Sequence, residues 1–228
     1  MQINAEFNVR VALDTEQMPW VPSPMPEVKR KMLDRGGGDV ARATSIVRYD
    51  PGSKFPAHVH GGGEEIFVLE GVFEDENGSY PAGTYLRNPP GSSHQPGSTL
   101  GCTLFVKLGQ FTPGDQRTVC TDTNASDWYQ GLVPGLSVMP LHEADGVNTA
   151  LVNWAPNTQF NRHVHPGGEE ILVLRGVFYD EHGAYQAGSW LRSPRYSIHT
   201  PYTKSEGALI YVKTGHLGAP TLHSLQEA

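Results

Sequence analysis

The stretch HVHGGGEEIFVLEGVFEDENGSYPAGTYLRNPPGSSH, residues 58–94, decides the fold because the chain contains it twice. It returns as HVHPGGEEILVLRGVFYDEHGAYQAGSWLRSPRYSIH, residues 163–199, with no gap and at an offset of 105 residues. Of the 37 aligned positions, 24 are identical. Similarity of this length at a constant offset indicates an internal repeat and not a shared short motif.

The repeat extends over nearly the whole chain. The matching positions beyond the central stretch are GCTLFVKLG (101–109) with GALIYVKTG (207–215), Trp20 with Trp128, and Val28 with Leu136. The turn-forming segment QFTPGDQ, residues 110–116, follows the last strand-like run of the first copy. A solenoid would show more copies of a shorter unit, so we expect a duplicated domain, with boundaries at 1–112 and 113–228.

Each copy has the pattern of β structure. Short apolar runs such as EEIFVLEGVF and TLFVKL are bounded by Gly, Pro, Asn and Asp. The segments ENGS (76–79) and EHGA (181–184) have the composition of hairpin turns. Strands this closely spaced favour an antiparallel barrel or a double-sheet jelly roll. The only helix that the sequence predicts is PEVKRKML, residues 26–33, which is entered through a proline.

Composition and charge exclude several classes of protein. The 228 residues carry a formal net charge of −7, and an acidic chain is a poor partner for nucleic acid, which requires a basic face. The short basic cluster at residues 29–31 is expected to lie on a solvated helix turn. No apolar run approaches the roughly 20 residues of a membrane span, and the first residues have no signal-peptide core. We therefore expect a cytoplasmic protein with neither nucleic acid nor membrane as a partner.

The chain has two cysteines and ten histidines, and only the histidines form a pattern. Cys102 and Cys120 make neither a disulfide framework nor a CxxC motif, so we expect two reduced thiols packed as small apolar groups. Six of the ten histidines fall at equivalent positions of the two copies. A glutamate accompanies them in each copy.

The histidine pattern has the chemistry of a metal site. Residues two apart in a strand point to the same face, so His58 and His60 project together. Glu64 follows them, and His94 comes 34 residues after His60. Imidazole nitrogen and carboxylate oxygen are good ligands for divalent transition metals. The predicted metal ligands are His58, His60, Glu64 and His94 in the first copy and His163, His165, Glu169 and His199 in the second.

These residues resemble the cupin signature, G-x5-H-x-H-x3/4-E-x6-G followed by G-x5-P-x-G-x2-H. The second copy departs from it at Asn157 and Tyr196, which replace glycines. Asn tolerates a left-handed backbone, whereas Tyr196 could reshape the mouth of the second barrel. The resemblance implies an all-β chain of two tandem cupin domains, which are jelly-roll β-barrels. The first copy matches at every position: Gly52, His58, His60, Glu64, Gly71, Gly83, Pro89, Gly91 and His94.

Each candidate glutamate has a second glutamate directly after it. The six-residue spacing to the next signature glycine selects Glu64 and Glu169 as ligands. Adjacent residues of a strand face opposite ways, so Glu65 and Glu170 are expected to face outward or to bond to nearby backbone.

The remaining charged and aromatic residues of the repeat have weaker assignments. Four basic residues could lie near the metal and favour an anionic substrate or enolate, but we interpret them as surface charges: Arg87, Arg192, Lys107 and Lys213. Tyr85 and Trp190 are interpreted as packing residues. The histidines outside the pattern are interpreted as surface residues: His142, His182, His216 and His223.

A narrower resemblance covers the string HxHxGGEE-I-x-VL-x-GVF-x-DE-x-G-x-Y-x-AG, with Trp20 upstream and GC-x-LFVK downstream. It looks like the cupin half of ChrR-type anti-sigma factors, and acetylacetone-cleaving dioxygenases look similar. In those anti-sigma factors a helical zinc domain with an HxxxCxxC motif holds the sigma factor, and this chain lacks that motif. The resemblance thus implies a metal-binding sensory domain, generally with zinc, without direct sigma-factor capture.

Three functions stay open. The first is a zinc-binding bicupin that senses a small-molecule ligand or oxidant and acts through a partner protein or as a homodimer. The second is an iron-dependent dioxygenase acting on a small dicarbonyl or enolisable substrate, and the third is a barrel whose metals only stabilise the fold. Four protein ligands leave open positions on a five- or six-coordinate ion, whereas they close a tetrahedral zinc site. The ligand types alone do not choose between zinc, iron, manganese and nickel, and up to two ions per chain are expected.

Overall fold

The computed structural model describes residues 1–37 and 42–218, and they form two compact units built of strands. The first barrel consists of residues 1–5 and 19–126, and the second barrel consists of residues 6–18 and 127–218. One 3-10 helix, Thr15–Gln17, interrupts the β structure. The predicted all-β fold is therefore confirmed. In the part of the chain that the structure describes, no helix is long and apolar enough to cross a membrane.

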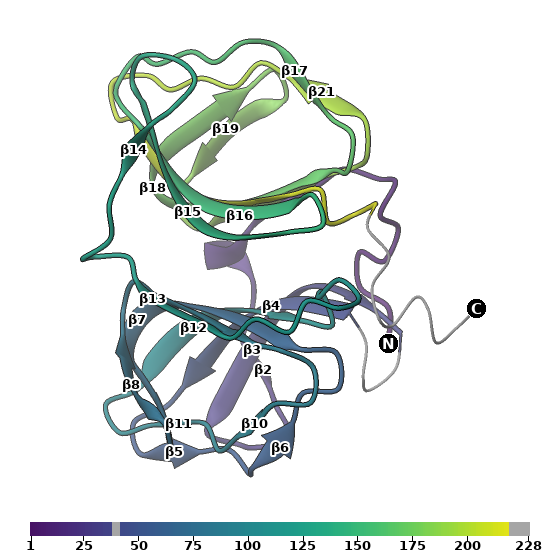
Figure 1. The fold of residues 1–228 in the computed structure, drawn as a ribbon, viewed down its shortest axis with the longest axis vertical. Helices are drawn as coiled ribbons and strands as arrows, with labels where there is room; N and C mark the ends of the chain where they lie inside the picture. Colours follow the sequence, from purple (N-terminus) through teal and green to yellow (C-terminus); the bar gives the residue numbers. More distant parts are fainter. Residues whose placement is uncertain (38–41, 219–228) are drawn as a thin grey trace. The chain divides into compact units, whose positions relative to one another are not determined.

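The strands of the first barrel can be followed in Figure 1. Their bounds are β2 (Val21–Pro22), β3 (Val28–Gly36), β4 (Arg42–Tyr49), β5 (Ser53–Lys54), β6 (His58–Val59), β7 (Glu64–Asp75), β8 (Gly78–Pro81), β9 (Thr84–Asn88), β10 (Ser93–His94), β11 (Gly97–Ser98), β12 (Cys102–Leu108) and β13 (Val119–Asp122). The main sheet has the order β13-β9-β7-β12-β4-β3-β2, and β6 pairs with β10 in a separate ribbon.

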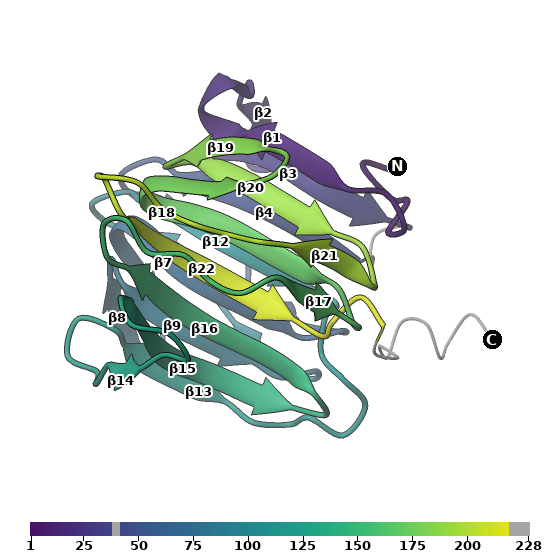
Figure 2. The ribbon, with the colours of Figure 1, turned by 90° about the horizontal axis from the view of Figure 1, so that it is seen from above.

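The second barrel repeats the main sheet of the first strand for strand, but its described residues have no strands equivalent to β5 and β11. Its strands are β1 (Val11–Asp14), β14 (Tyr129–Gln130), β15 (Leu136–Ala144), β16 (Val147–Trp154), β17 (His163–His165), β18 (Glu169–Asp180), β19 (Gly183–Gln186), β20 (Ser189–Ser193), β21 (Ser197–His199) and β22 (Ala208–Thr214). The main sheet has the order β1-β20-β18-β22-β16-β15-β14, and Figure 2 shows β18, β22 and β16 side by side. β17 pairs with β21, as β6 does with β10.

Each sequence copy contributes its first strand to the other barrel. β13 belongs to the second copy by sequence, yet it pairs with β9. β1 lies at the equivalent position 108 residues earlier and pairs with β20. These pairings cover edges that would otherwise present unpaired N–H and C=O groups. The compact units therefore differ at their edges from the expected domains 1–112 and 113–228.

The helix predicted at residues 26–33 is wrong. β3 occupies Val28–Gly36 and pairs along its length with β4. The sequence of the second copy argues against a helix here, because Pro140 stands at the position equivalent to Met32, where it would interrupt a helix. Both strands have a β-bulge just after this position, so Met32 and Pro140 are equivalent in structure as well as in sequence.

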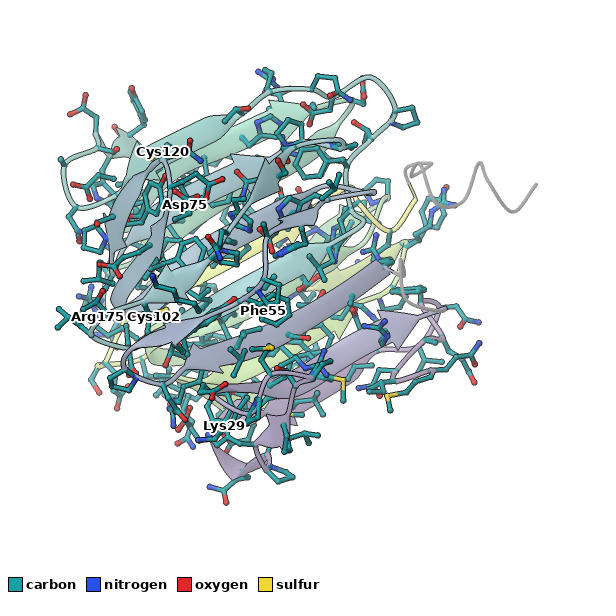
Figure 3. All side chains as sticks on the ribbon, turned by 90° about the horizontal axis from the view of Figure 1, so that it is seen from below. Lys29, Phe55, Asp75, Cys102, Cys120 and Arg175 are labelled. Carbon is teal, nitrogen blue, oxygen red and sulfur yellow. The ribbon has the colours of Figure 1, made fainter. Side chains whose placement is uncertain are left out.

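Each barrel has its own apolar core, formed by alternate residues of the paired strands. The first core contains Val28, Tyr49, Ile66, Val68, Phe73, Leu86, Cys102, Leu104 and Val106. The second contains Leu136, Trp154, Ile171, Val173, Phe178, Tyr185, Leu191, Ala208 and Ile210. Both cysteines are free thiols (Figure 3). The predicted packing is confirmed for Cys102, which is buried, and wrong for Cys120, which is exposed.

Two signature glycines of the first barrel allow a matched test of local packing. Gly71 and Gly52 both have positive φ, at 72° and 78°. A Cβ on Gly71 would overlap the carbonyl oxygen of Gly101, whereas a Cβ on Gly52 would meet nothing within 4 Å. Gly52→Ala should therefore lower the free energy of unfolding by about 1 to 2 kcal/mol, the cost of a left-handed backbone for alanine. Gly71→Ala should lose about 1 to 3 kcal/mol more, because the backbone must shift.

Urea denaturation of both variants and the parent protein measures these losses as changes in the free energy of unfolding. Equal losses for the two variants would contradict the close approach of β7 to Gly101.

Candidate metal centres

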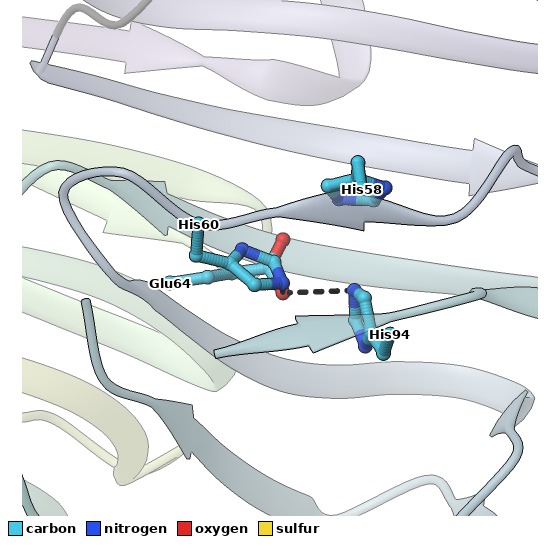
Figure 4. A group of neighbouring side chains, drawn as sticks. All are labelled: His58, His60, Glu64 and His94. Carbon is cyan, nitrogen blue, oxygen red and sulfur yellow. Dashed lines mark ion pairs between the residues drawn. The ribbon is translucent and has the colours of Figure 1, made fainter. Parts of the chain in front are cut away.

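The first barrel brings the four predicted ligands of the first copy together. His58 and His94 are register partners on β6 and β10, and Glu64 begins β7. Each of the four side chains, His60 included, offers one ligand atom within 4.8 Å of the others. Figure 4 shows this group, with the contact between Glu64 and His94 dashed. Residues 36 positions apart in the chain thus meet because the short ribbon folds one end of the barrel over β7.

The spacing of the ligand atoms suits a metal ion. Glu64 Oε2 lies 3.7 Å from His60 Nε2 and 3.5 Å from His94 Nε2. Neighbouring ligands around an ion with bonds of about 2.1 Å lie about 3.0 Å apart in octahedral geometry and about 3.4 Å apart in tetrahedral geometry. The Nε2 atoms of His60 and His94 are buried without a hydrogen-bond partner among the described residues. A cation at this point would satisfy lone pairs that are otherwise costly to bury.

Hydrogen bonds on the far side of the rings hold Nε2 toward the site. His58 Nδ1 lies 3.0 Å from the carbonyl oxygen of Pro56, and His94 Nδ1 lies 3.4 Å from Asp75 Oδ2. Asn88 Nδ2 donates to Glu64 Oε2 at 3.3 Å. Metal-binding histidines are commonly oriented in this way, because the partner selects the tautomer and the ring direction. Asp75 therefore belongs to the candidate site, and the sequence reasoning missed it, although it is identical in both copies as Asp75 and Asp180.

The second barrel brings its three histidines still closer. His199 Nε2 lies 3.0 Å from His165 Nε2 and 3.2 Å from His163 Nε2. Glu169 is 3.5 Å from His165 Nε2 and 3.6 Å from His199 Nε2. Ring nitrogens at such distances repel through their lone pairs unless a proton or a metal ion lies between them. The three histidines therefore form the candidate group here, and Glu169 lies outside it, in contrast to Glu64 at the first site.

The two sites differ in what supports the third histidine. Asp180 Oδ2 lies 3.9 Å from His199 Nδ1 and also binds Arg10 Nη2 at 3.2 Å. Arg10 precedes β1, and its equivalent in the second copy is Thr118. The exchange of first strands therefore brings a positive charge behind the second site, where the position equivalent to Arg10 supplies none behind the first. No motif indicated Arg10, because its role depends on tertiary pairing.

Burial sets the protonation of the site residues. Burial raises the pKa of Glu64 and of Glu169 to about 7. Burial and the neighbouring histidines lower the pKa of His60 and of His165 to about 3. At neutral pH these two imidazoles are neutral, and their lone pairs are available to a metal. Without a metal, each glutamate holds a proton for about half of the time.

The glutamates that follow the ligands lie in a second buried network. Glu65 accepts hydrogen bonds from Tyr85 Oη and Arg87 Nε, both at 3.0 Å. Glu170 accepts from Trp190 Nε1 at 2.8 Å and lies 3.1 Å from His216 Nε2. Both glutamates are thus bonded to side chains, and each is only 1% exposed. Glu64 and Glu169 face the candidate sites, in agreement with the opposite facing of adjacent strand residues.

The interpretation of the four basic residues as surface charges is wrong, because each has an exposed fraction of at most 2%: Arg87, Arg192, Lys107 and Lys213. The reason is that carboxylates and rings cover this face, as where Asp115 Oδ2 binds Arg87 Nη1 at 2.8 Å. His216 is also buried, so its surface assignment is wrong too. Tyr85 and Trp190 are buried, as their interpretation as packing residues requires. His182 is exposed, His142 is half-buried, and His223 lies outside the described residues.

The two departures from the signature keep the backbone of the glycines that they replace. Asn157 has φ 57° and Tyr196 has φ 61°, both left-handed. The tolerance expected of Asn157 is confirmed. Tyr196 is 64% exposed, so its ring extends into solvent while the turn before His199 keeps the glycine-like conformation.

A cavity opens on the first site. Its volume is about 650 Å³, and it is bordered by all four candidate ligands of the first barrel. Sites for small molecules commonly have about 300 to 1,000 Å³. The first site is therefore accessible to a ligand as well as to an ion.

The pKa values predict that metal binding displaces a proton at mildly acidic pH. Glu64 and Glu169 have folded pKa values of about 7, so at about pH 6 the metal-free carboxyls are mostly protonated and must lose that proton on binding. The first site should release the proton of Glu64 at pH 6 and much less at pH 8. The second site should release more at pH 6, because the carboxylates of Asp180 and Glu169 raise the pKa of His199, whose proton must also leave. The apparent affinity of the first site should rise about tenfold per unit between pH 5 and pH 7 and then flatten.

Calorimetric titration with Zn²⁺ in two buffers of different ionisation enthalpy measures the protons released. Equal release at pH 6 and pH 8 would show that the glutamates do not titrate with metal binding.

The fold is shared with many solved structures. One is a proposed dioxygenase from Nostoc punctiforme, with a TM-score of 0.77 and 16% identity over 93% of this chain and 85% of that one. Another is YlbA from E. coli, with a TM-score of 0.70 and 16% identity over 92% of each chain. The bacterial pirin YhhW from E. coli, solved with nickel(II), has a TM-score of 0.64 and 15% identity over 90% of this chain and 99% of that one. At these identities the likeness shows the fold alone.

Sequence comparison identifies the family. No curated protein sequence matches the chain. The model of the ChrR cupin-like domain matches it twice, at residues 8–112 and 116–218. Together the two matches cover most of the 228 residues, and each contains one complete set of candidate ligands. The resemblance drawn from the sequence is confirmed, and the chain belongs to the family of ChrR cupin-like domains as a bicupin.

Proposed function

We propose that the first barrel holds a divalent transition metal, zinc in the native protein, and uses it to bind a small molecule from the adjoining cavity. The ligands are His58, His60, Glu64 and His94. The observation that carries the proposal is that these four side chains border a cavity of about 650 Å³. A metal bound only for stability would be closed off by protein, whereas this arrangement leaves room for a further ligand.

The proposed role is sensory, as in the cupin half of ChrR-type proteins. The family match supports it. Binding of a small molecule or oxidant at the first site would be passed to a partner protein or a second copy of the chain. The two free cysteines accord with the reducing conditions of the cytoplasm, where we place the protein.

The second barrel is proposed to hold a second ion through His163, His165, Glu169 and His199. The three histidine nitrogens at 3.0 and 3.2 Å support this assignment. The full chain would then bind two ions, one in each barrel.

The alternative is an iron-dependent dioxygenase acting on a small dicarbonyl or enolisable substrate. The open cavity beside the first site favours it, as does the fold shared with a proposed dioxygenase from Nostoc punctiforme. Iron would supply oxygen activation when bound. The chain itself would hold the iron through the four candidate ligands, orient the substrate against the apolar walls and exclude water.

Removal of either pair of histidines should remove one ion. His58→Ala with His60→Ala should abolish the first site and leave one ion per chain, because two of its four ligands are lost. His163→Ala with His165→Ala should do the same for the second site. Elemental analysis of protein reconstituted with Zn²⁺ gives the count, and His182→Ala, an exposed histidine outside both sites, is the control. A reconstituted parent protein without transition metal would overturn the proposal.

The native metal and oxygen consumption together separate the sensor from the enzyme. We expect zinc in protein purified without added metal, and no oxygen uptake with small β-dicarbonyls such as acetylacetone. Protein reconstituted anaerobically with Fe²⁺ is the second sample for the same measurement with an oxygen electrode. Native iron with multiple turnovers would replace the sensory proposal by the dioxygenase.

A further inference from the structure

Two arginines of β3 line the same cavity as the first metal site. Arg30 pairs with Val47 and Arg35 pairs with Ala43, and all four residues lie on one face of the sheet. The β-bulge near Leu33 makes this possible, because residues five positions apart would otherwise point to opposite faces. Both arginines border the cavity that reaches the four candidate ligands. The cavity is therefore basic on one wall.

The prediction of a solvated helix turn at residues 29–31 is wrong, because these residues lie in the strand β3. Lys29 and Lys31 lie on the opposite face of β3, where Lys29 pairs with Asp50 at 2.8 Å and Lys31 stacks on Trp20 at 4.5 Å. Lys29 is labelled in Figure 3. Of these three residues only Arg30 borders the cavity, whereas Lys29 and Lys31 lie on the other face of the strand.

Arg30 has the properties of an anion receptor. Its Nε is buried without a hydrogen-bond partner, and Arg30 forms no ion pair with any described residue. Burial, and secondly the charge of Arg35, lowers the pKa of Arg30. Arg30 is half-buried, and a carboxylate entering the cavity would pair with its guanidinium through charge-assisted hydrogen bonds. Asp34 borders a smaller adjoining cavity of about 50 Å³ but makes no ion pair with Arg30.

The rest of the cavity is mostly apolar. The walls are formed by Val28, Val47, Phe55, Ile66, Phe73, Leu104 and Val106. Tyr49 also borders the cavity, and its hydroxyl makes no hydrogen bond to a described residue. Such walls suit an aliphatic chain, whereas the one unpaired guanidinium suits a single anionic head group.

The second barrel lacks this recognition chemistry. Val138 occupies the position equivalent to Arg30, and Glu143 occupies the position equivalent to Arg35. Trp154 stands where Tyr49 stands in the first barrel. The duplication thus kept the metal-type histidines in both copies while a basic wall is present in only one.

We infer that the first barrel binds a short-chain aliphatic carboxylate, with Arg30 pairing with the carboxylate and the apolar walls holding the chain beside the metal site. The inference rests on the proposed function only in that the same cavity opens on the proposed metal. It assigns the ligand class and restricts it to the first of the two barrels.

Calorimetric titration of zinc-loaded full-length protein with butyrate and hexanoate tests the inference. Hexanoate should bind more tightly than butyrate because its chain buries more apolar surface. Hexanamide, which has the same shape without the charge, should bind at least about tenfold more weakly. Inorganic phosphate should not compete. Binding of hexanamide as tight as that of hexanoate, or equal competition by phosphate, would overturn the ligand class.

Substitution of Arg30 identifies the anchor. Arg30→Gln should weaken hexanoate binding by about 10- to 100-fold, the loss expected for one hydrogen-bonded charge pair. Arg30→Lys should recover part of it, and Lys29→Gln, on the opposite face of the same strand, should change nothing. Unchanged hexanoate affinity in Arg30→Gln would refute the assignment.

Zinc content and the melting temperature are measured on every sample. The zinc content separates the proposed function from the inference. Parent protein that takes up no zinc but still binds hexanoate through Arg30 refutes the proposed function alone. A zinc-loaded protein that binds no carboxylate refutes the inference alone. A melting temperature that matches the parent shows that a loss of binding in Arg30→Gln does not come from misfolding.

Discussion

The imidazole nitrogens gathered at one end of each barrel are the constraint on which the rest of the structure depends. In the first barrel, the Nε2 atoms of His60 and His94 are buried without a hydrogen-bond partner among the described residues, and Glu64 Oε2 lies 3.7 and 3.5 Å away. In the second, the three ring nitrogens crowd within 3.0 and 3.2 Å. Such an arrangement is unfavourable in an apolar interior unless a cation binds. The hydrogen-bond partners of the Nδ1 atoms orient the rings toward such an ion, whereas the raised pKa of each glutamate means that the ion must displace a proton.

The duplication preserves the metal chemistry and varies its surroundings. Both copies keep the aspartate behind the third histidine, as Asp75 and Asp180. The exchange of first strands then gives only the second site a cation behind that aspartate, from Arg10. The cavity shows the opposite difference, because Arg30 in the first barrel corresponds to the uncharged Val138 in the second. The first site therefore has an arginine on its cavity wall, whereas the second has an arginine beside the aspartate that contacts its third histidine.

Buried charge outside the sites forms a second system. Glu65 with Arg87, and Glu170 with His216, are almost completely buried on the strand faces opposite the candidate ligands. Buried ion pairs contribute little net stability, but removal of one partner leaves an expensive isolated charge. These residues therefore constrain the strands that carry Glu64 and Glu169 without lining the cavity of the first barrel.

The amino-acid sequence by itself determined the duplication, the all-β class and the cupin identity, because repeats, turn residues and signature spacing are local properties of the chain. It also selected Glu64 over Glu65 through the six-residue spacing to Gly71, which is a local property. The role of Glu64 as a metal ligand stays a prediction. The structure corrected the predictions that depended on neighbours: the helix at 26–33 is the strand β3, and Arg87 is buried.

Only the tertiary structure decided which charges face the candidate metal. A β-bulge turns Arg35 to the face of Arg30, and the exchange of first strands brings Arg10 to Asp180. Neither effect has a sequence signature, because both depend on which strand lies beside which. The spacing in the sequence specified the candidate ligands, whereas pairing between distant strands specified the electrostatic environment around them.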